Sequence, residues 1–360
     1  MDAAGQLLIH IRVGGGQVRE VTSQVRRPPA AALLVGRPVD QAEGLIPALY
    51  SLCGRAQGLA ARAALEAAEG RLVDPVQIAH HSRRVVAEAV QEHLWRLLLD
   101  WPNALGLPVG REAFAVWYKR MGAAAGSEGE WSALANGLEA WMDAHLLGGE
   151  AVRWTGARHL ANIPETGVCA EAVRALANDA YRCPTPGQPV CVPSVCAADC
   201  AKALHGLGAE GPEWRGAPAE TGALSTHAEH PMIRALFEDG WRIAARYLAR
   251  VLALVTAANA LRAPPEAPVL SAACLGEGCG IARVETARGA LLHWAEVAQG
   301  RVCQYRVLAP TEWNFHPRGA FGDELKGVRG SGAALRARVG AAVLSLDPCV
   351  PWRLEVSENA

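Results

Sequence analysis

The chain has 360 residues, of which 51% are hydrophobic and 20% charged, a composition typical of globular proteins that excludes intrinsic disorder. Its 35 basic and 36 acidic side chains give a formal charge of -1, which argues against binding to nucleic acid or to an anionic membrane. The N-terminus lacks the basic and apolar segments of a signal peptide. We therefore expect a cytoplasmic protein whose ten cysteines are reduced thiols or metal ligands.

The N-terminal residues predict a hairpin followed by a helical segment. Apolar and polar residues alternate over residues 7–13, as in a half-buried strand. Three consecutive glycines then turn the chain into a returning strand over residues 17–21. A helical pattern covers residues 40–69, with interruptions near Pro47 and Cys53.

A second helix is predicted to begin after Asp74, whose side chain suits an N-cap, with Pro75 in the first helical position. We expect this helix to end at residues 100–102, where another proline occurs. The middle of the chain, residues 103–220, is harder to assign, because helix-like runs alternate there with a proline-rich loop.

The C-terminal part begins with one long amphipathic helix predicted over residues 231–261. Two arginines precede its longest apolar stretch, which falls short of the ~18 apolar residues that a membrane span needs. Three strands are then predicted over residues 281–286, 291–297 and 302–308, followed by a helix over residues 330–345.

These elements indicate an α+β fold that is predominantly helical and carries small β-hairpins, because strands and helices do not alternate as βαβ units. We expect residues 1–360 to form a single domain. It has an N-terminal part (1–102), a divergent middle segment (103–220) and a C-terminal part (221–360).

Two cysteines near opposite ends of the chain each look like half of a pair. Cys53 follows Leu52, and Cys349 follows an Asp-Pro dipeptide. A full C-x-x-C motif at both places would supply four thiolates, enough for a closed metal site. The fourth positions here are Ala56 and Trp352, which cannot act as thiolate ligands.

Five motifs, taken in order, resemble those of the large subunit of nickel–iron hydrogenases. The resemblance covers residues 1–102 and 221–352, and it implies the fold of that subunit. The motifs are Gly36-Arg37-Pro38, Leu52-Cys53-Gly54, the run from Glu285 to Trp294, the run from Pro310 to Asn314, and Asp347-Pro348-Cys349.

At several positions the chain differs from the hydrogenase large subunits, and these differences indicate which of their relatives it resembles. In the enzymes the first cysteine of each pair is a terminal nickel ligand, and the second bridges nickel and iron. The bridging positions correspond here to Ala56 and Trp352, and the proton-transferring glutamate corresponds to Ala30 or Ala31. The chain therefore resembles the HupK-type hydrogenase expression and formation proteins. This implies a non-catalytic assembly protein, for which no nickel is expected.

The resemblance implies that Cys53 and Cys349 transiently hold an Fe(CN)₂(CO) unit, displaced from its place in the enzymes. By the same match, Arg288 and Thr311 would lie against the diatomic ligands. The implied partners are the hydrogenase large-subunit precursor, a HypC-type chaperone and a HypD-type maturation protein. Two alternatives stay open. One is a metal-free decoy that docks these proteins, and the other is a divergent hydrogenase-like redox subunit.

The remaining cysteines allow two further metal hypotheses. A glycine-rich loop with Cys274 and Cys279 could bring a third thiolate to the pocket, or it could be a turn with incidental cysteines. A second group could bind zinc or an iron–sulfur cluster, although its spacing matches no standard signature. Its members are Cys183, Cys191, Cys196 and Cys200.

Overall fold

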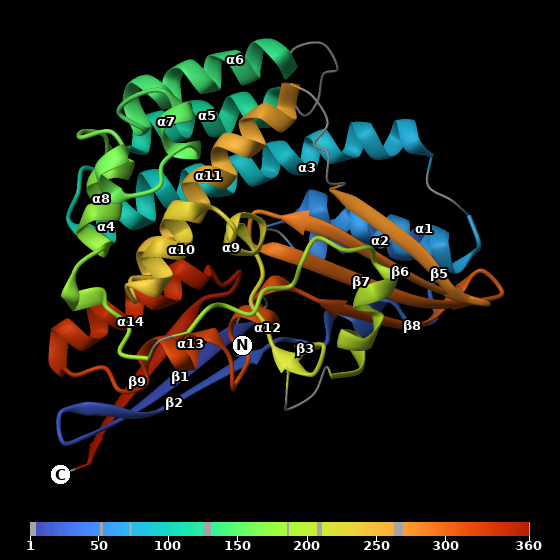
Figure 1. Ribbon diagram of the computed structural model, residues 1–360. Helices are drawn as coiled ribbons and strands as arrows, with labels where there is room; N and C mark the ends of the chain where they lie inside the picture. Colours follow the sequence, from blue (N-terminus) through green and yellow to red (C-terminus); the bar gives the residue numbers. More distant parts are fainter. Residues whose placement is uncertain are drawn as a thin grey trace.

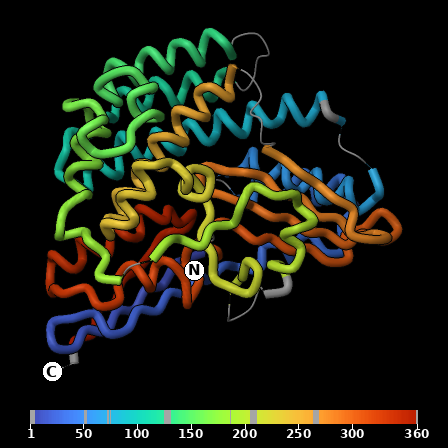
Figure 2. The backbone as a smooth tube through the Cα atoms, in the orientation of Figure 1, coloured from blue at the N-terminus to red at the C-terminus, as the bar shows by residue number. Residues whose placement is uncertain are grey.

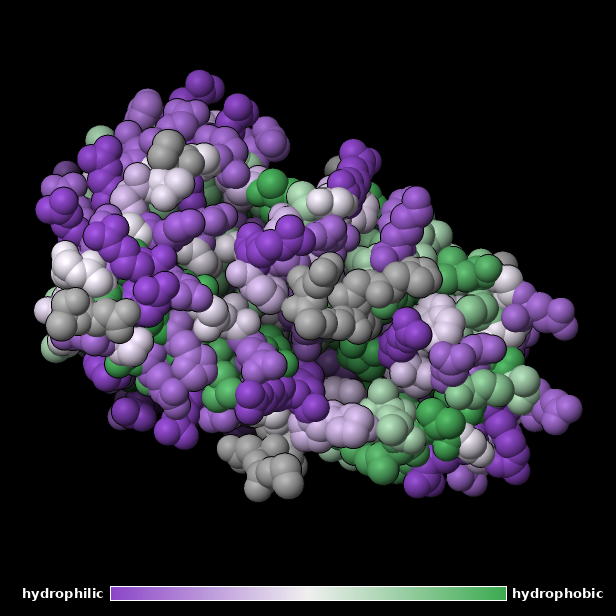
Figure 3. Space-filling model, turned by 90° about the horizontal axis from the view of Figure 1, so that it is seen from below, coloured by the Kyte–Doolittle hydropathy of each residue, from purple (hydrophilic) through white to green (hydrophobic). Residues whose placement is uncertain are grey.

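The structure is a computed structural model that describes residues 5–50, 53–71, 74–124, 131–185, 187–206, 211–262 and 269–359. Helices form the larger part of the molecule, and a four-stranded and a three-stranded sheet lie beside and below them (Figure 1). The predicted fold class, helical with small β-hairpins, is confirmed. Viewed from below, polar side chains cover much of the surface, and apolar ones gather mainly towards the end that holds the larger sheet (Figure 3).

The helices and strands have the following bounds. The α-helices are α1 (Val39–Leu49), α2 (Gly54–Ala68), α3 (Pro75–Trp95), α4 (Trp101–Leu105), α5 (Arg111–Ala124), α6 (Trp131–Trp141), α7 (Ala151–Thr155), α8 (Val168–Leu176), α9 (Ala223–His227), α10 (Pro231–Glu238), α11 (Arg242–Arg262), α12 (Pro310–Asn314), α13 (Ala320–Leu325) and α14 (Gly332–Leu346). The strands are β1 (Gln6–Gly14), β2 (Gln17–Arg26), β3 (Glu213–Trp214), β4 (Ala217–Pro218), β5 (Leu270–Gly276), β6 (Cys279–Thr286), β7 (Gly289–Ala298), β8 (Arg301–Leu308) and β9 (Trp352–Asn359).

The two ends of the chain meet in one sheet. β1 pairs antiparallel with β2, as the alternating residues predicted, and parallel with the C-terminal strand β9. Figure 2 shows this red strand beside the blue hairpin. Residues 352–357 of β9 alternate apolar and polar side chains, so the sequence carried a strand signal here that the predicted elements left out. The pairing of β9 with β1 fixes the chain directly after Cys349.

The larger sheet has the order β5-β6-β7-β8 and is antiparallel throughout. It contains the three predicted strands and adds β5. Helix α2 lies very close to it, because Gly280 of β6 faces the helix backbone. A Cβ atom at Gly280 would lie 2.1 Å from the carbonyl oxygen of Ala64. This absence of a side chain lets α2, and therefore Cys53 at its start, sit directly on the sheet.

Two helix predictions need correction. The helix after Asp74 does not end at residues 100–102, because a π-helical turn over Arg96–Asp100 carries it into α4. Pro102 is tolerated since it lies in the first turn of α4. The long helix predicted over residues 231–261 is two helices, α10 and α11. Gly240, with a φ of +82°, separates them.

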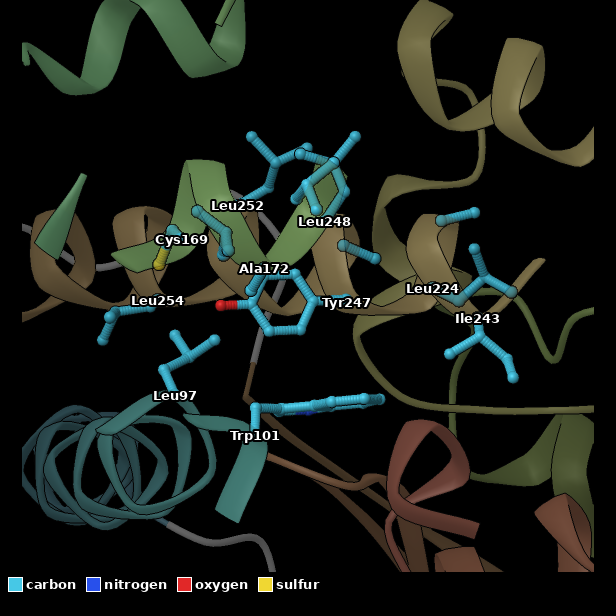
Figure 4. Packing of buried hydrophobic residues seen from close by; sticks show 14 of the residues in the cluster. Leu97, Trp101, Cys169, Ala172, Leu224, Ile243, Tyr247, Leu248, Leu252 and Leu254 are labelled. Carbon is cyan, nitrogen blue, oxygen red and sulfur yellow. The ribbon is translucent and has the colours of Figure 1, made fainter. Parts of the chain in front are cut away.

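Helix α11 forms the centre of the hydrophobic core. Tyr247 packs edge-on against Trp101 of α4, with ring centroids 5.3 Å apart (Figure 4). By length and composition α11 could cross a membrane, but 78% of its most apolar window is buried inside the protein. It is therefore the core helix of the fold.

One buried carboxylate joins helices from distant parts of the chain. Asp347 is the C-cap of α14, has a left-handed φ of +52° and is 2% exposed. Its Oδ1 accepts a 2.7 Å hydrogen bond from Arg96, and its Oδ2 lies 2.9 Å from an Nη atom of Arg250 in α11. The Nε of Arg288, in the turn between β6 and β7, lies 3.3 Å from Oδ1.

This arrangement fixes the ionisation state of Asp347. Burial alone would raise the pKa of its carboxyl, but the charges of Arg96, Arg288 and Arg250 together lower it well below its usual range. The ion pairs hold the end of α3, the middle of α11, the β6–β7 turn and the end of α14 in one place. Cys349 is two residues further along the chain, so its position depends on them.

Replacing Asp347 by Asn should destabilise the protein by about 3–5 kcal/mol, because two buried guanidinium groups and one half-buried one lose their shared counter-ion. Asparagine tolerates the left-handed backbone at this position, so the loss of stability reports the contribution of the Asp347 charge. The measurement is urea unfolding at neutral pH. Glu355→Gln on the exposed strand β9 is the control and should change stability by less than about 0.5 kcal/mol.

The same variant should change how the stability of the protein depends on pH in the acid range. Because the pKa of Asp347 is depressed in the folded state, its stabilising contribution is present above the unfolded pKa of about 4 and is lost as the pH falls below it. Asp347→Asn should lack this part of the acid destabilisation. Equal stability and equal acid response in the variant and the wild type would contradict the account.

Candidate metal centre

The structure brings Cys53 and Cys349 together, although 295 positions separate them in the chain. Cys53 is the N-cap residue of α2, and Cys349 lies between the end of α14 and β9. Both half-buried side chains pack against the same apolar cluster, which includes Ala60 of α2 and Leu291 of β7. The packing of α2 on the larger sheet positions Cys53, and the Asp347 ion pairs position Cys349.

The sulfur of Cys349 receives two polar contacts. Thr311 Oγ1 lies 3.0 Å from Sγ and also accepts a 3.0 Å hydrogen bond from the backbone N–H of Cys349. Since the hydroxyl oxygen already accepts, its own hydrogen can point at the sulfur. Arg27 Nη2 donates a 2.9 Å hydrogen bond to the same sulfur. Thr311, predicted as a site residue, therefore contacts a candidate metal ligand directly.

Arg27 is a site residue that the sequence reasoning missed. Its Nε donates a 2.6 Å hydrogen bond to Glu312, which fixes the guanidinium beside Cys349. Burial alone would lower the pKa of Arg27, but Glu312 and Cys349 raise it well above its usual value, so its charge is permanent. Arg27 follows directly after β2 and lies in none of the five motifs. Only the sheet pairing places it at the site.

The sulfur of Cys53 lies in a less polar environment. Burial, followed by the nearby sulfur of Cys349, raises the pKa of the Cys53 thiol to about 12. Its hydrogen-bonding partner is Gln57 Nε2, at 3.5 Å. The first backbone N–H groups of α2 do not reach the sulfur, because Glu88 of α3 accepts both the Arg55 and the Ala56 N–H at 3.0 Å. The helix terminus is therefore capped by a carboxylate.

Arg288 lies beside the two cysteines, as predicted, but it is firmly paired. Its guanidinium forms ion pairs with Glu92 of α3 and with Asp347. Burial alone would lower its pKa, but Asp347, Glu92 and both cysteines raise it above the usual range. Its positive charge in turn lowers the pKa of Cys53, partly offsetting the effect of burial. Arg288 is a fixed, permanently charged wall of the pocket.

The positions of the missing cysteines do not supply other ligands. Ala56 is fully buried in α2, and Trp352 is 42% exposed on β9, so its indole does not fill the place of a lost ligand. The site thus offers two soft sulfur donors, from Cys53 and Cys349, beside charged and hydroxyl groups. This donor set fits low-spin iron that already carries its own ligands, and it does not fit a four-thiolate nickel site.

The hypothesis of a third thiolate from Cys274 or Cys279 is wrong. These residues lie at the tip of the β5–β6 hairpin, and Cys274 Sγ bonds to the carbonyl oxygen of Gly276 at 3.2 Å. Gly280, next to Cys279, packs against the C-terminal half of α2. Cys53 lies at the opposite end of this helix, about 15–20 Å away at 1.5 Å per residue.

The four cysteines of the middle segment also do not form a metal site. Cys183 bonds to the carbonyl of Asp323, whereas Cys191 lies near Glu220. Cys196 bonds to Asp199 at 3.0 Å, and Cys200 lies near Arg283 as well as near Cys196. In the described part of the chain, no three His, Cys, Asp or Glu residues are grouped so that they could hold a metal ion. The predicted cluster is wrong because its side chains turn towards different neighbours.

Comparisons with known proteins identify a matching family model, a similar fold and similar sequences. The model of the nickel-dependent hydrogenase family matches residues 253–350, which include Arg288, Thr311 and Cys349. The Ni-Fe-Se hydrogenase of D. vulgaris Hildenborough has a similar fold, with a TM-score of 0.65 over 93% of this chain and 94% of that one, at 13% sequence identity.

Two curated relatives are similar over almost their whole lengths. The hydrogenase expression/formation protein HupV of Azotobacter chroococcum is 30% identical, and the alignment covers 98% of this chain and 99% of the relative. HoxV of Cupriavidus necator, described in the same words, is 32% identical over 96% of this chain and 94% of the relative. The chain therefore belongs to the family of hydrogenase expression/formation proteins that includes HupK, HupV and HoxV.

Proposed function

We propose that this chain is a non-catalytic, cytoplasmic scaffold for hydrogenase assembly. It receives an Fe(CN)₂(CO) unit, holds it through Cys53 and Cys349, and passes it to the hydrogenase large-subunit precursor. The observation that carries this proposal is the meeting of two cysteines in a large-subunit fold without the two bridging cysteines. The relatives, which are named as hydrogenase expression/formation proteins, support a role in assembly.

The charges around the two sulfurs suit this cargo. An iron(II) ion with two cyanides and one carbonyl is neutral, so two thiolates make the bound unit carry two negative charges. Arg27 donates to the sulfur of Cys349, and the charge of Arg288 acts on both cysteines. Two permanent positive charges therefore oppose the negative charge that binding brings into a partly buried site.

The small number of protein ligands suits transfer. Two thiolates hold the unit, whereas the diatomic ligands complete much of the iron coordination without the protein. At the end of the transfer, the thiolates of a large-subunit precursor, which has four, can replace the two thiolates of this chain on the iron. HypC-type and HypD-type maturation proteins are the proposed donors. No nickel is expected, because Ala56 and Trp352 stand where the bridging thiolates would be.

Infrared spectroscopy tests the proposal. Protein purified without oxygen from a host that makes hydrogenase should show cyanide and carbonyl stretching bands. Cys53→Ala and Cys349→Ala should each abolish these bands, because one sulfur cannot hold the unit in place. Cys303→Ala is the matched control, since Cys303 is exposed on β8, and it should keep them.

The outcome of this experiment separates the competing functions. Native protein without the bands, although it still binds the maturation proteins, would overturn the scaffold and favour a metal-free docking decoy. Turnover of hydrogen by the purified protein would favour a divergent hydrogenase-like subunit.

The metal-free protein should show unequal cysteine reactivity. Because the pKa of the Cys53 thiol is raised to about 12, almost none of it is thiolate at pH 8. Its alkylation should be at least about a hundredfold slower than that of the exposed Cys303. Mass spectrometry of peptides after timed treatment with iodoacetamide measures both rates. Equal rates would contradict the described environment of Cys53.

A further inference from the structure

A chain of buried polar side chains leads away from the sulfur of Cys53. Gln57 Nε2 lies 3.5 Å from Sγ, and Gln57 Oε1 lies 2.8 Å from His293 Nε2. His293 Nδ1 lies 2.6 Å from the hydroxyl of Tyr305. Gln57 is 2% exposed, His293 is fully buried, and Tyr305 is 7% exposed. These three residues, on α2, β7 and β8, are called the Gln57 chain below.

The direction of each hydrogen bond follows from the chemistry of the side chains. Only the nitrogen of the Gln57 amide can donate to the sulfur, which leaves its oxygen facing His293. An amide oxygen only accepts, so His293 Nε2 must carry the hydrogen. Burial lowers the pKa of His293 to about 3, so the ring is neutral and Nδ1 has no hydrogen. The Tyr305 hydroxyl therefore donates to Nδ1.

The chain is also held in place mechanically. The rings of His293 and Tyr305 meet edge to face, with centroids 5.6 Å apart. Their strands are neighbours in the larger sheet, where His293 pairs with Val307 and Tyr305 with Ala295. Gln57 lies on the first turn of α2, one turn after Cys53, and α2 is pressed against this sheet. The sheet thus supports the donor that reaches the sulfur.

The sulfur of Cys349 has different hydrogen-bonding partners. Cys349 receives a charged donor from Arg27 and lies beside the hydroxyl of Thr311, and no atom of the Gln57 chain is among these contacts. A hydrogen bond to a thiolate withdraws electron density from the sulfur and so tunes the metal that the sulfur binds. The two cysteines therefore present sulfurs of different electron density.

We propose that Gln57, His293 and Tyr305 are positioning residues for Cys53, whose sulfur they supply with an amide donor of fixed direction. This inference rests on the proposed iron-holding function. In the loaded protein, the donor reduces the electron density that Cys53 gives to iron. The carbonyl on that iron then stretches at a higher frequency than it would without the donor.

The test uses Gln57→Leu and Tyr305→Phe in the full chain. Leucine keeps the volume of Gln57 without its amide, and phenylalanine keeps the ring of Tyr305 without its hydroxyl. Loaded Gln57→Leu should show its carbonyl band at a lower frequency than the wild type, and Tyr305→Phe a smaller shift in the same direction. Gln304→Leu, exposed on β8, and Tyr118→Phe, exposed on α5, are the controls and should show no shift.

A second measurement needs no iron. Nitrogen NMR of ¹⁵N-histidine-labelled, metal-free protein should show His293 with its hydrogen on Nε2. Gln57→Leu should remove this single preference, because the Tyr305 hydroxyl can either donate to Nδ1 or accept from it. Unshifted carbonyl bands in loaded Gln57→Leu, or a hydrogen on Nδ1 of His293 in the wild type, would overturn the inference. Absence of iron bands in the wild type would instead count against the proposed function. The NMR result would then still decide the direction of the Gln57 chain.

Discussion

The ion pairs around Asp347 are the constraint on which the site depends. This carboxylate lies between Arg96, Arg250 and Arg288, which come from three elements far apart in the sequence. Burying the guanidinium groups of Arg250 and Arg288, and half-burying that of Arg96, is costly unless each has a counter-charge, so the elements that carry them are held around Asp347. The chain leaves this point towards Cys349 and then pairs with β1. The position of one candidate ligand is therefore set from both sides.

The other candidate ligand is positioned by different means. Cys53 begins a helix that lies directly on the larger sheet, where Gly280 leaves no space between them. The two sulfurs meet in environments that differ in polarity: Cys349 faces Arg27 and Thr311, whereas Cys53 faces mainly apolar groups and one amide. Burial raises the pKa of the Cys53 thiol to about 12, so this thiol keeps its proton until a metal displaces it. This asymmetry suits a site that both accepts and releases its cargo.

The sequence motifs predicted those candidate site residues that lie inside them. Cys53, Cys349, Arg288 and Thr311 were found this way, because each motif fixes a residue type at a fixed spacing. Arg27 and Glu88 were not found, since they reach the site only through strand pairing and helix packing. One signal was available: Arg246 and Arg250 lie one turn apart in the largely apolar middle of α11. Buried arginines require buried acidic partners, which the structure supplies as Glu220 and Asp347.

The central claim is that two cysteine sulfurs, and no nickel site, hold an iron unit in this fold. X-ray absorption at the iron edge of anaerobically purified protein tests it most directly, because it counts the sulfur atoms bound to each iron. The account predicts two sulfur neighbours per iron together with light atoms from the diatomic ligands, and no stoichiometric nickel. Iron without sulfur neighbours, or nickel bound by the same protein, would contradict it.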